Sequence, residues 1–221
     1  MVTVVYEDDQ VRIPDWVVDL ESFRRWAETD ELPETGHVGY LKGEVRIDIS
    51  KEQLFSHNQV KTELVHVVGG LVKARKLGHY FTSGLFMTNV TADFSVQPDG
   101  TFVSAESWET GRVRPVRGKH GGYSGLEGSP DMVLEVLSRI SVHKDTVVLR
   151  EAYWEAGIRE YWLVDARRAP LRFDIFRHTP RGYVATRKQA GWLRSVVFRK
   201  SFQLTQQTDA LGFPEFTLAV R

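Results

Sequence analysis

The chain has 221 residues, 42% hydrophobic and 26% charged, and its acids and bases balance to a formal net charge of zero. Such values are typical of a folded globular protein and exclude a disordered one, and they give no bulk attraction to nucleic acid. Cysteine is absent, which excludes disulfides and thiolate metal sites and favours a cytoplasmic location. Because the start is acidic and no apolar run reaches ~18 residues, we expect neither a signal peptide nor a membrane span.

Residues 1–36 are predicted to form a helical N-terminal extension. Its helix spans Asp19–Thr29, where apolar residues recur at helical spacing, and Asp19 is placed to cap it. After it, His37–Ile49 alternates apolar and polar residues around Lys42-Gly43, which predicts a β-hairpin turning at that pair.

A longer helix is predicted from Ser56 to about Leu77, with Ser56 and Gln59 as a capping box. Strands are predicted over Tyr80–Met87 and Ala92–Ser104. Residues 106–128 are rich in glycine and basic residues, which predicts a long connecting loop.

The segment Asp131–Ser138 is apolar on both faces, as in a strand covered on both sides of a sheet. A helix from Ser141 to Ala156 and a strand over Glu160–Asp165 follow, so the two strands should be parallel neighbours. From Leu171 onward the apolar period is near two, which predicts a β-rich C-terminal extension over 171–221. The simplest fold is one α/β domain over 1–221.

Glu135 is the one carboxylate within the apolar run from Met132 to Leu137 of this segment. An unpaired ionised Glu in such a place costs several kcal/mol or more, so it should be paired, protonated or bound to a metal. A second carboxylate, Asp99, lies upstream in Val96-Gln97-Pro98-Asp99-Gly100. Oxygen ligands of this kind suit Mg²⁺ or Mn²⁺, and we interpret the two acids as a divalent-metal site. The alternative is a buried Glu135 that forms a salt bridge with an arginine.

Three stretches resemble the Uma-two family of restriction-endonuclease-like proteins, in the PD-(D/E)XK nuclease superfamily. They are Pro98-Asp99, then Glu135-Val136-Leu137-Ser138, then the run from Tyr153 to Asp165, Tyr-Trp-Glu-Ala-Gly-Ile-Arg-Glu-Tyr-Trp-Leu-Val-Asp. The resemblance covers roughly 40–165, and the block from Glu135 to Asp165 is its most specific part. It implies a restriction-endonuclease-like mixed β-sheet flanked by helices and a Mg²⁺-dependent phosphodiesterase site.

By this resemblance Asp99 and Glu135 are metal ligands, and the backbone carbonyl of Val136 adds a further one. Glu44, in the Gly43-Glu44 turn, matches an acidic family position and would hold a metal-bound water. Its alternative is an ordinary exposed hairpin glutamate. His57 matches a polar family position, for which we expect a capping or packing role.

The catalytic lysine is where this chain departs from the family. The superfamily lysine stands two residues after the acid, which is Leu137 here, and the relatives' shifted lysine matches Leu149. Lys144, near the predicted helix start, is the remaining candidate, since a helix N-terminus also favours a phosphate. The alternative is a solvated lysine in a first helical turn.

These residues predict a metal-dependent endonuclease that hydrolyses phosphodiester bonds in DNA, with Mg²⁺ or Mn²⁺ as cofactor and a homodimer as a plausible assembly. Two basic segments, over 112–119 and 175–208, are candidate phosphate-contacting surfaces or else ordinary solvated faces. The rival prediction is a catalytically weak or inactive nucleic-acid-binding or interaction module that keeps the nuclease fold.

Overall fold

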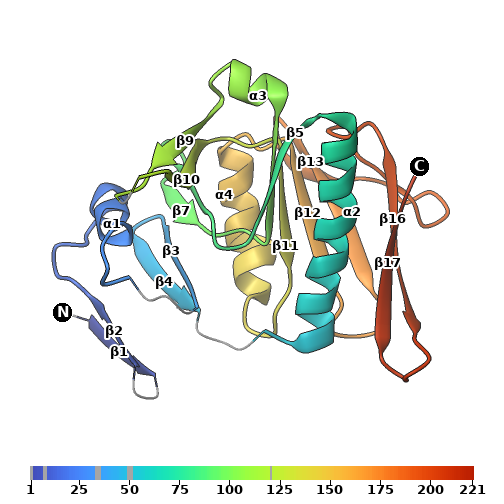
Figure 1. The fold of residues 1–221 in the computed structure, drawn as a ribbon, viewed down its shortest axis with the longest axis horizontal. Coiled ribbons are helices and arrows are strands. Elements are labelled where there is room, and N and C mark those ends of the chain that lie inside the picture. The colour runs from blue at the N-terminus through green and yellow to red at the C-terminus, as the bar shows by residue number, and fades with distance from the viewer. Residues whose placement is uncertain (1, 7–8, 33–35, 49–51, 120) are drawn as a thin grey trace. The chain divides into compact units, whose positions relative to one another are not determined.

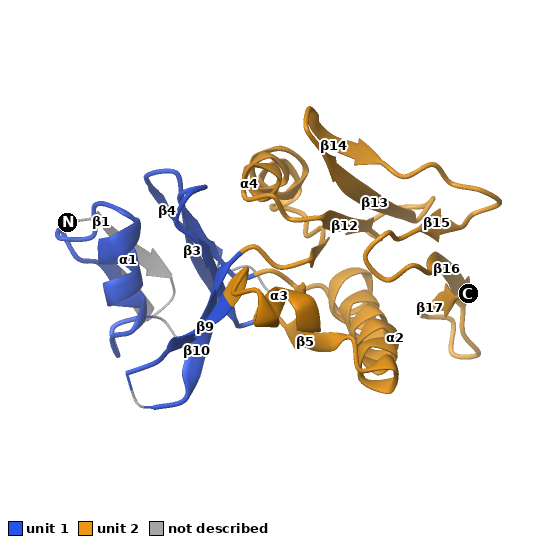
Figure 2. Cartoon of the chain, turned by 90° about the horizontal axis from the view of Figure 1, so that it is seen from above, with its two compact units in different colours: residues 1–50, 84–97, 114–128 blue, residues 51–83, 98–113, 129–221 orange. Residues whose placement is uncertain are grey.

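The computed structural model describes residues 2–6, 9–32, 36–48, 52–119 and 121–221 (Figure 1). The chain divides into two compact units, each assembled from separated stretches of sequence (Figure 2). Unit 1 comprises residues 1–50, 84–97 and 114–128, and unit 2 comprises 51–83, 98–113 and 129–221.

Unit 1 contains a two-stranded hairpin, a helix and a six-stranded mixed sheet of order β4-β3-β7-β6-β10-β9. Its pairs are antiparallel where register is defined, except that β6 and β10 run parallel. The elements are β1 (Val2–Tyr6), β2 (Asp9–Ile13), α1 (Leu20–Ala27), β3 (His37–Leu41), β4 (Glu44–Asp48), β6 (Phe86–Asn89), β7 (Phe94–Val96), β9 (Val113–Arg117, beginning at the last residue of a unit 2 stretch) and β10 (Tyr123–Gly128).

Helix α1 begins where the sequence predicts. The carboxylate of Asp19 accepts a hydrogen bond from the Ser22 N–H at 2.8 Å, and the Ser22 hydroxyl receives the Asp19 N–H in return, which satisfies two helix-terminal donors. The apolar face of the helix carries Phe23 and Trp26, which pack with Tyr40 in the unit 1 core. The cap and the apolar stripe therefore both indicate a helix that begins directly after Asp19.

Unit 2 is built on a second six-stranded mixed sheet, of order β14-β13-β12-β11-β8-β5. Strands β11 and β12 are parallel, and the other pairs in this sheet are antiparallel. A three-stranded antiparallel sheet of order β15-β16-β17 follows. The elements are the π-helix η1 (Leu54–Gln59), α2 (Val60–Arg75), β5 (Gly78–Thr82), β8 (Gly100–Ser104), α3 (Ala105–Glu109), β11 (Met132–Val136), the π-helix η2 (Lys144–Val148), α4 (Leu149–Glu155), β12 (Glu160–Asp165), β13 (Arg172–Thr179), β14 (Gly182–Ala185), β15 (Leu193–Arg194), β16 (Ser201–Thr208) and β17 (Pro214–Val220).

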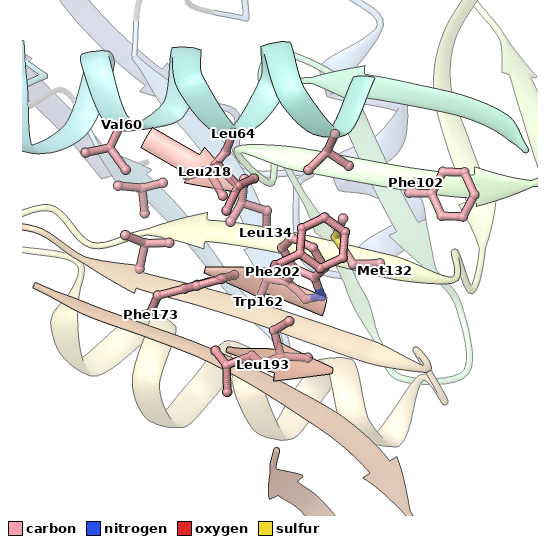
Figure 3. Close-up of a cluster of buried hydrophobic side chains, with 14 of the residues drawn as sticks. Val60, Leu64, Phe102, Met132, Leu134, Trp162, Phe173, Leu193, Phe202 and Leu218 are labelled. Carbon is pink, nitrogen blue, oxygen red and sulfur yellow. The ribbon is translucent and has the colours of Figure 1, made fainter. Parts of the chain in front are cut away.

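Helices α2 and α4 lie on opposite faces of the unit 2 sheet (Figures 1 and 2). Side chains alternate across a strand, so Met132, Leu134 and Val136 face α2 and join the main core with Trp162 (Figure 3). Glu135 stands between them in sequence and therefore points to the other face, toward α4. The pleat of one strand thus separates the apolar core from the candidate site.

Much of the predicted fold is confirmed. The chain is mixed α/β, α1 begins at the Asp19 cap, and β3 and β4 form the hairpin that turns at Lys42-Gly43. Ile49, its predicted last residue, lies outside the described residues. The β11–α4–β12 unit has parallel neighbouring strands, and residues 171–221 are β-rich.

Several local predictions are wrong. The N-terminal stretch is not only helical, because the hairpin β1–β2 precedes α1; its β-branched valines and threonine favour strands. Residues 106–128 are not one loop but contain the end of α3 and the strands β9 and β10. Pro115 is tolerated in β9 because that strand lies at the edge of its sheet.

The long helix after residue 52 also begins differently from the predicted capping box. Gln53, and not Ser56, supplies the cap, since its side-chain oxygen accepts the N–H groups of Phe55 and Ser56 at 3.0 and 2.9 Å. A π-helical turn, η1, then leads into α2. The helix ends at Lys76, which takes the left-handed conformation with φ of 52°, and Gly78 already belongs to β5.

Candidate metal centre

Asp99 stands immediately before β8, at the end of that strand where it begins, and β8 lies between β11 and β5 in the unit 2 sheet. The β8–β11 register pairs Gly100 with Leu134, so Asp99 comes beside the next residues of β11. The backbone N–H of Val136 donates a 2.8 Å hydrogen bond to Oδ2 of Asp99, whose side chain is only 8% exposed. Strand pairing therefore brings the two acids together, although 36 positions separate them in the chain.

Glu135 is buried on the α4 side of β11. The Tyr153 hydroxyl of α4 donates a 2.7 Å hydrogen bond to its Oε1. Burial raises the pKa of Glu135 well above its ordinary value, and the negative charges of Asp145 and Asp99 raise it further, against the opposing effects of Lys144 and the Tyr153 hydrogen bond. Within the described part of the chain no arginine pairs with Glu135, so the salt-bridge alternative is not what the structure shows.

Lys144, the first residue of η2, reaches the same group of acids. Its Nζ lies 3.3 Å from Oδ1 of Asp145, which is almost completely buried. Burial would lower the pKa of Lys144, but the carboxylates of Glu135 and Asp145 outweigh it and raise that pKa. Burial raises the pKa of Asp145 despite the lysine. The structure thus brings three predicted residues together, Asp99, Glu135 and Lys144, and adds Asp145.

A second group of side chains meets Asp99 from η1 and α2. His57 Nε2 lies 3.6 Å from Asp99 Oδ2, and His57 Nδ1 lies 3.6 Å from Oε1 of Glu52. Lys61 donates a short hydrogen bond to that same Glu52 oxygen and lies 3.6 Å from Asp99 Oδ1. Burial alone would raise the pKa of Glu52, but hydrogen bonds from Lys61 and Asn58 outweigh it and lower that pKa to about 2.

The donor set of these residues fits a divalent cation. One ligand atom each from Glu52, His57 and Asp99 lies within 4.8 Å of the others. Glu135 and Asp145 add carboxylates whose pKa values are raised by burial and by neighbouring acids, Asp145 and Asp99 beside Glu135 and Asp99 beside Asp145; a bound cation would relieve both effects. Carboxylates suit Mg²⁺ and Mn²⁺, and one imidazole is compatible with Mn²⁺.

The structure also describes the surroundings of Glu44 and of the two expected lysine positions. Glu44 belongs to unit 1, where it begins β4, has a side chain 66% exposed, and pairs with Arg46 at 2.6 Å. Its role as holder of a metal-bound water stays a prediction, as does the Val136 carbonyl as a ligand. Leu137 and Leu149, the two expected lysine positions, are both buried apolar side chains.

Sequence reasoning missed Glu52, Lys61 and Asp145, and assigned His57 a capping or packing role. One signal was available for Lys61, because His57 and Lys61 stand four residues apart and so share a helix face. Asp145 is adjacent to Lys144 in a segment predicted to be helical, where an acid is easily taken for a solvated one. Glu52 carries no such signal, since it precedes the helix.

The profile of the Uma2 (Uma-two) family, described as "Putative restriction endonuclease", matches residues 20–221. None of the curated proteins matches this chain.

Among solved structures, the fold is similar to that of a protein from Anabaena variabilis ATCC 29413, titled a putative nuclease belonging to DUF820. The TM-score is 0.56 at 20% sequence identity, and the match covers 82% of this chain and 91% of that one. That likeness supports the predicted fold. Since the family profile extends over most of the sequence, the chain belongs to the Uma2 family of restriction-endonuclease-like proteins.

Proposed function

We propose that this protein is a metal-dependent endonuclease that hydrolyses phosphodiester bonds in DNA, with Mg²⁺ or Mn²⁺ as its cofactor. The observation that carries the proposal is the meeting of Asp99 and Glu135 on neighbouring strands, both buried and close enough for one charge to perturb the other. Membership of a family described as "Putative restriction endonuclease" supports it.

In this proposal Asp99 and Glu135 hold the cation, and the Val136 carbonyl adds a ligand. When bound, the cation would activate a water and neutralise charge on the scissile phosphate. Tyr153 holds the Glu135 carboxylate in place through its 2.7 Å hydrogen bond. Lys144 supplies a positive charge next to Glu135.

A rival function has one specific observation in its favour. Both positions at which the family and its superfamily carry the lysine are leucines, buried in the described structure. A member without that amine can keep the fold and bind nucleic acid without cutting it. The outcome depends on whether another amine performs the role.

Cleavage of a supercoiled plasmid tests the proposal directly. We expect nicking by the purified chain in Mg²⁺ or Mn²⁺ and none after removal of the metal with EDTA. Asp99→Asn and Glu135→Gln should each lower the rate by at least about a hundredfold, the loss typical of removing a group that stabilises transition-state charge.

Glu151→Gln is the matched control, since Glu151 is an exposed acid on α4 outside the site. It should cut at the rate of the unaltered chain. Equal cutting by Asp99→Asn and the unaltered chain would identify a contaminant. Absence of cutting on single- and double-stranded DNA and RNA, together with a salt-dependent gel shift, would favour the rival function.

Assembly is a separate part of the proposal. Cutting both strands of a duplex suits two sites, so we propose a homodimer on DNA. Sedimentation with and without a DNA duplex measures it, and a monomer in both conditions would contradict it.

A further inference from the structure

The candidate centre contains two lysines, Lys144 and Lys61. Lys144 faces Glu135 and Asp145, whereas Lys61 faces Glu52 and Asp99 from the first turn of α2. The two ammonium groups therefore lie against different pairs of carboxylates, and of the two only Lys144 is a candidate from the sequence.

Lys61 lies where a cation would be expected to bind. Glu52, His57 and Asp99 offer ligand atoms within 4.8 Å of one another, and the Lys61 ammonium contacts both carboxylates of this set. Its side chain is only 12% exposed, so the charge is largely removed from water. A lysine placed in this way neutralises the acids as a metal ion would.

His57 gives an independent sign that the set is built for a cation. The ring is more than nine-tenths buried, and within the described part of the chain its Nδ1 has no hydrogen-bond partner. Both ring nitrogens instead lie 3.6 Å from carboxylate oxygens, too far for hydrogen bonds. A buried imidazole nitrogen left without a partner is unfavourable unless something else comes to it.

We propose that Glu52, His57 and Asp99 form a second cation position and that Lys61 occupies it, so that the centre takes one divalent ion instead of two. The inference rests on the proposed function for the first ion, held by Asp99 and Glu135. Lys61 then supplies the second positive charge, 3.6 Å from Oδ1 of Asp99. This assigns it the part that a second metal ion plays in two-metal phosphodiesterases.

Metal stoichiometry tests the inference without relying on activity. Equilibrium dialysis and calorimetry with Mn²⁺ alone should find one ion per chain for the unaltered protein and two for Lys61→Met, which keeps the length of the side chain but not its charge. Lys73→Met, at an exposed lysine of the same helix, should bind one ion. The double variant Lys61→Met/Glu52→Gln should return to one, because the second position loses a ligand.

The activity of Lys61→Met should also change its dependence on metal. Cutting should fall by about a hundredfold at Mn²⁺ that saturates only the first site, and recover when the second ion binds. Thermal melting with and without Mn²⁺ tests folding, and Lys61→Gln provides a second variant if Lys61→Met does not fold.

The outcomes separate the inference from the proposed function. If the unaltered chain binds no divalent ion, the proposed function fails and the inference fails with it. If it binds one ion and both Lys61 variants also bind one, only the inference is overturned. Two ions on the unaltered chain would likewise overturn it, while leaving the nuclease proposal in place.

Discussion

A single buried carboxylate dominates the chemistry at the residue scale. Glu135 accepts a hydrogen bond from Tyr153, and its pKa is raised by burial first and then by the charges of Asp145 and Asp99. A structural role alone would be served better by an apolar residue at this place, since burying an acid is costly. A carboxylate beside Asp99 is what the proposed metal site requires.

Lys144 gives a residue-scale prediction with a defined sign. Its charge lowers the pKa of Glu135 against burial, so Lys144→Met should raise that pKa further. A proton then competes with the metal for the carboxylate up to a higher pH, and the midpoint of Mn²⁺ binding should move upward in pH. Calorimetry from about pH 5 to 8 measures the shift. An unchanged midpoint, equal to that of Lys73→Met, would show that Lys144 does not act on Glu135.

At the element scale, the site depends on two π-helical turns. Turn η1 carries His57 just before α2, and η2 carries Lys144 and Asp145 just before α4. A π-helical turn adds a residue to the helical repeat, and such turns occur frequently at functional sites. Here both stand at the start of a helix, and each presents polar side chains to the carboxylates of the sheet edge.

Strand β12 supplies a buried acid, Glu160, that serves structure. Glu160 accepts hydrogen bonds from Ser195 Oγ at 2.7 Å, from Trp162 Nε1 at 3.0 Å, and from the N–H of Val196 at 2.5 Å. These bonds join the sheet to the segment that follows β15. Burial raises the pKa of Glu160 and outweighs these hydrogen bonds, which oppose the shift.

This raised pKa predicts how stability depends on pH. Above the ordinary value of 4.5 the unfolded chain loses the Glu160 proton while the folded chain keeps it, so the free energy of unfolding falls as pH rises through the folded pKa. Glu160→Gln has no such proton. Urea unfolding across this range should show the unaltered chain losing stability relative to the variant as pH rises. A constant difference between the two proteins would contradict the prediction.

At the scale of the whole molecule, each unit has its own aromatic core. In unit 2, Trp162 is fully buried, with ring centroids 4.7 Å from Phe202 and 5.5 Å from Phe173 (Figure 3). In unit 1, Phe23 packs with Trp26 and Tyr40.

None of the helices among the described residues has the length and apolar character needed to span a membrane.

Truncating the unit 2 core should destabilise the protein strongly. Trp162→Ala removes a large buried side chain and leaves a cavity, which typically costs about 3–5 kcal/mol. Denaturant unfolding measures the change. Trp16→Ala is the control, because Trp16 is 46% exposed and its loss should cost far less. A loss below about 1 kcal/mol for Trp162→Ala would mean that the core relaxes around the missing ring.

The sequence by itself determined the fold class and the β11–α4–β12 unit, and it singled out Asp99 and Glu135 as the proposed metal ligands. Those features are local or periodic, such as the Asp19 cap, the alternation around Lys42-Gly43 and the apolar run around Glu135. The family resemblance then gave Asp99 and Glu135, already paired as candidate metal ligands, the role of a nuclease centre. The long glycine-rich connection was misjudged because short edge strands such as β9 leave a weak pattern.

Only the tertiary structure decided which amines and further acids meet those two carboxylates. Lys61 reaches Asp99 because the first turn of α2 lies beside the start of β8. Asp145 lies close enough to Glu135 to raise its pKa because η2, on the connection from β11 to α4, places it there. Contacts of this kind depend on strand register and helix placement, which fix distances between residues far apart in sequence. The spacing of residues along the chain does not give these distances.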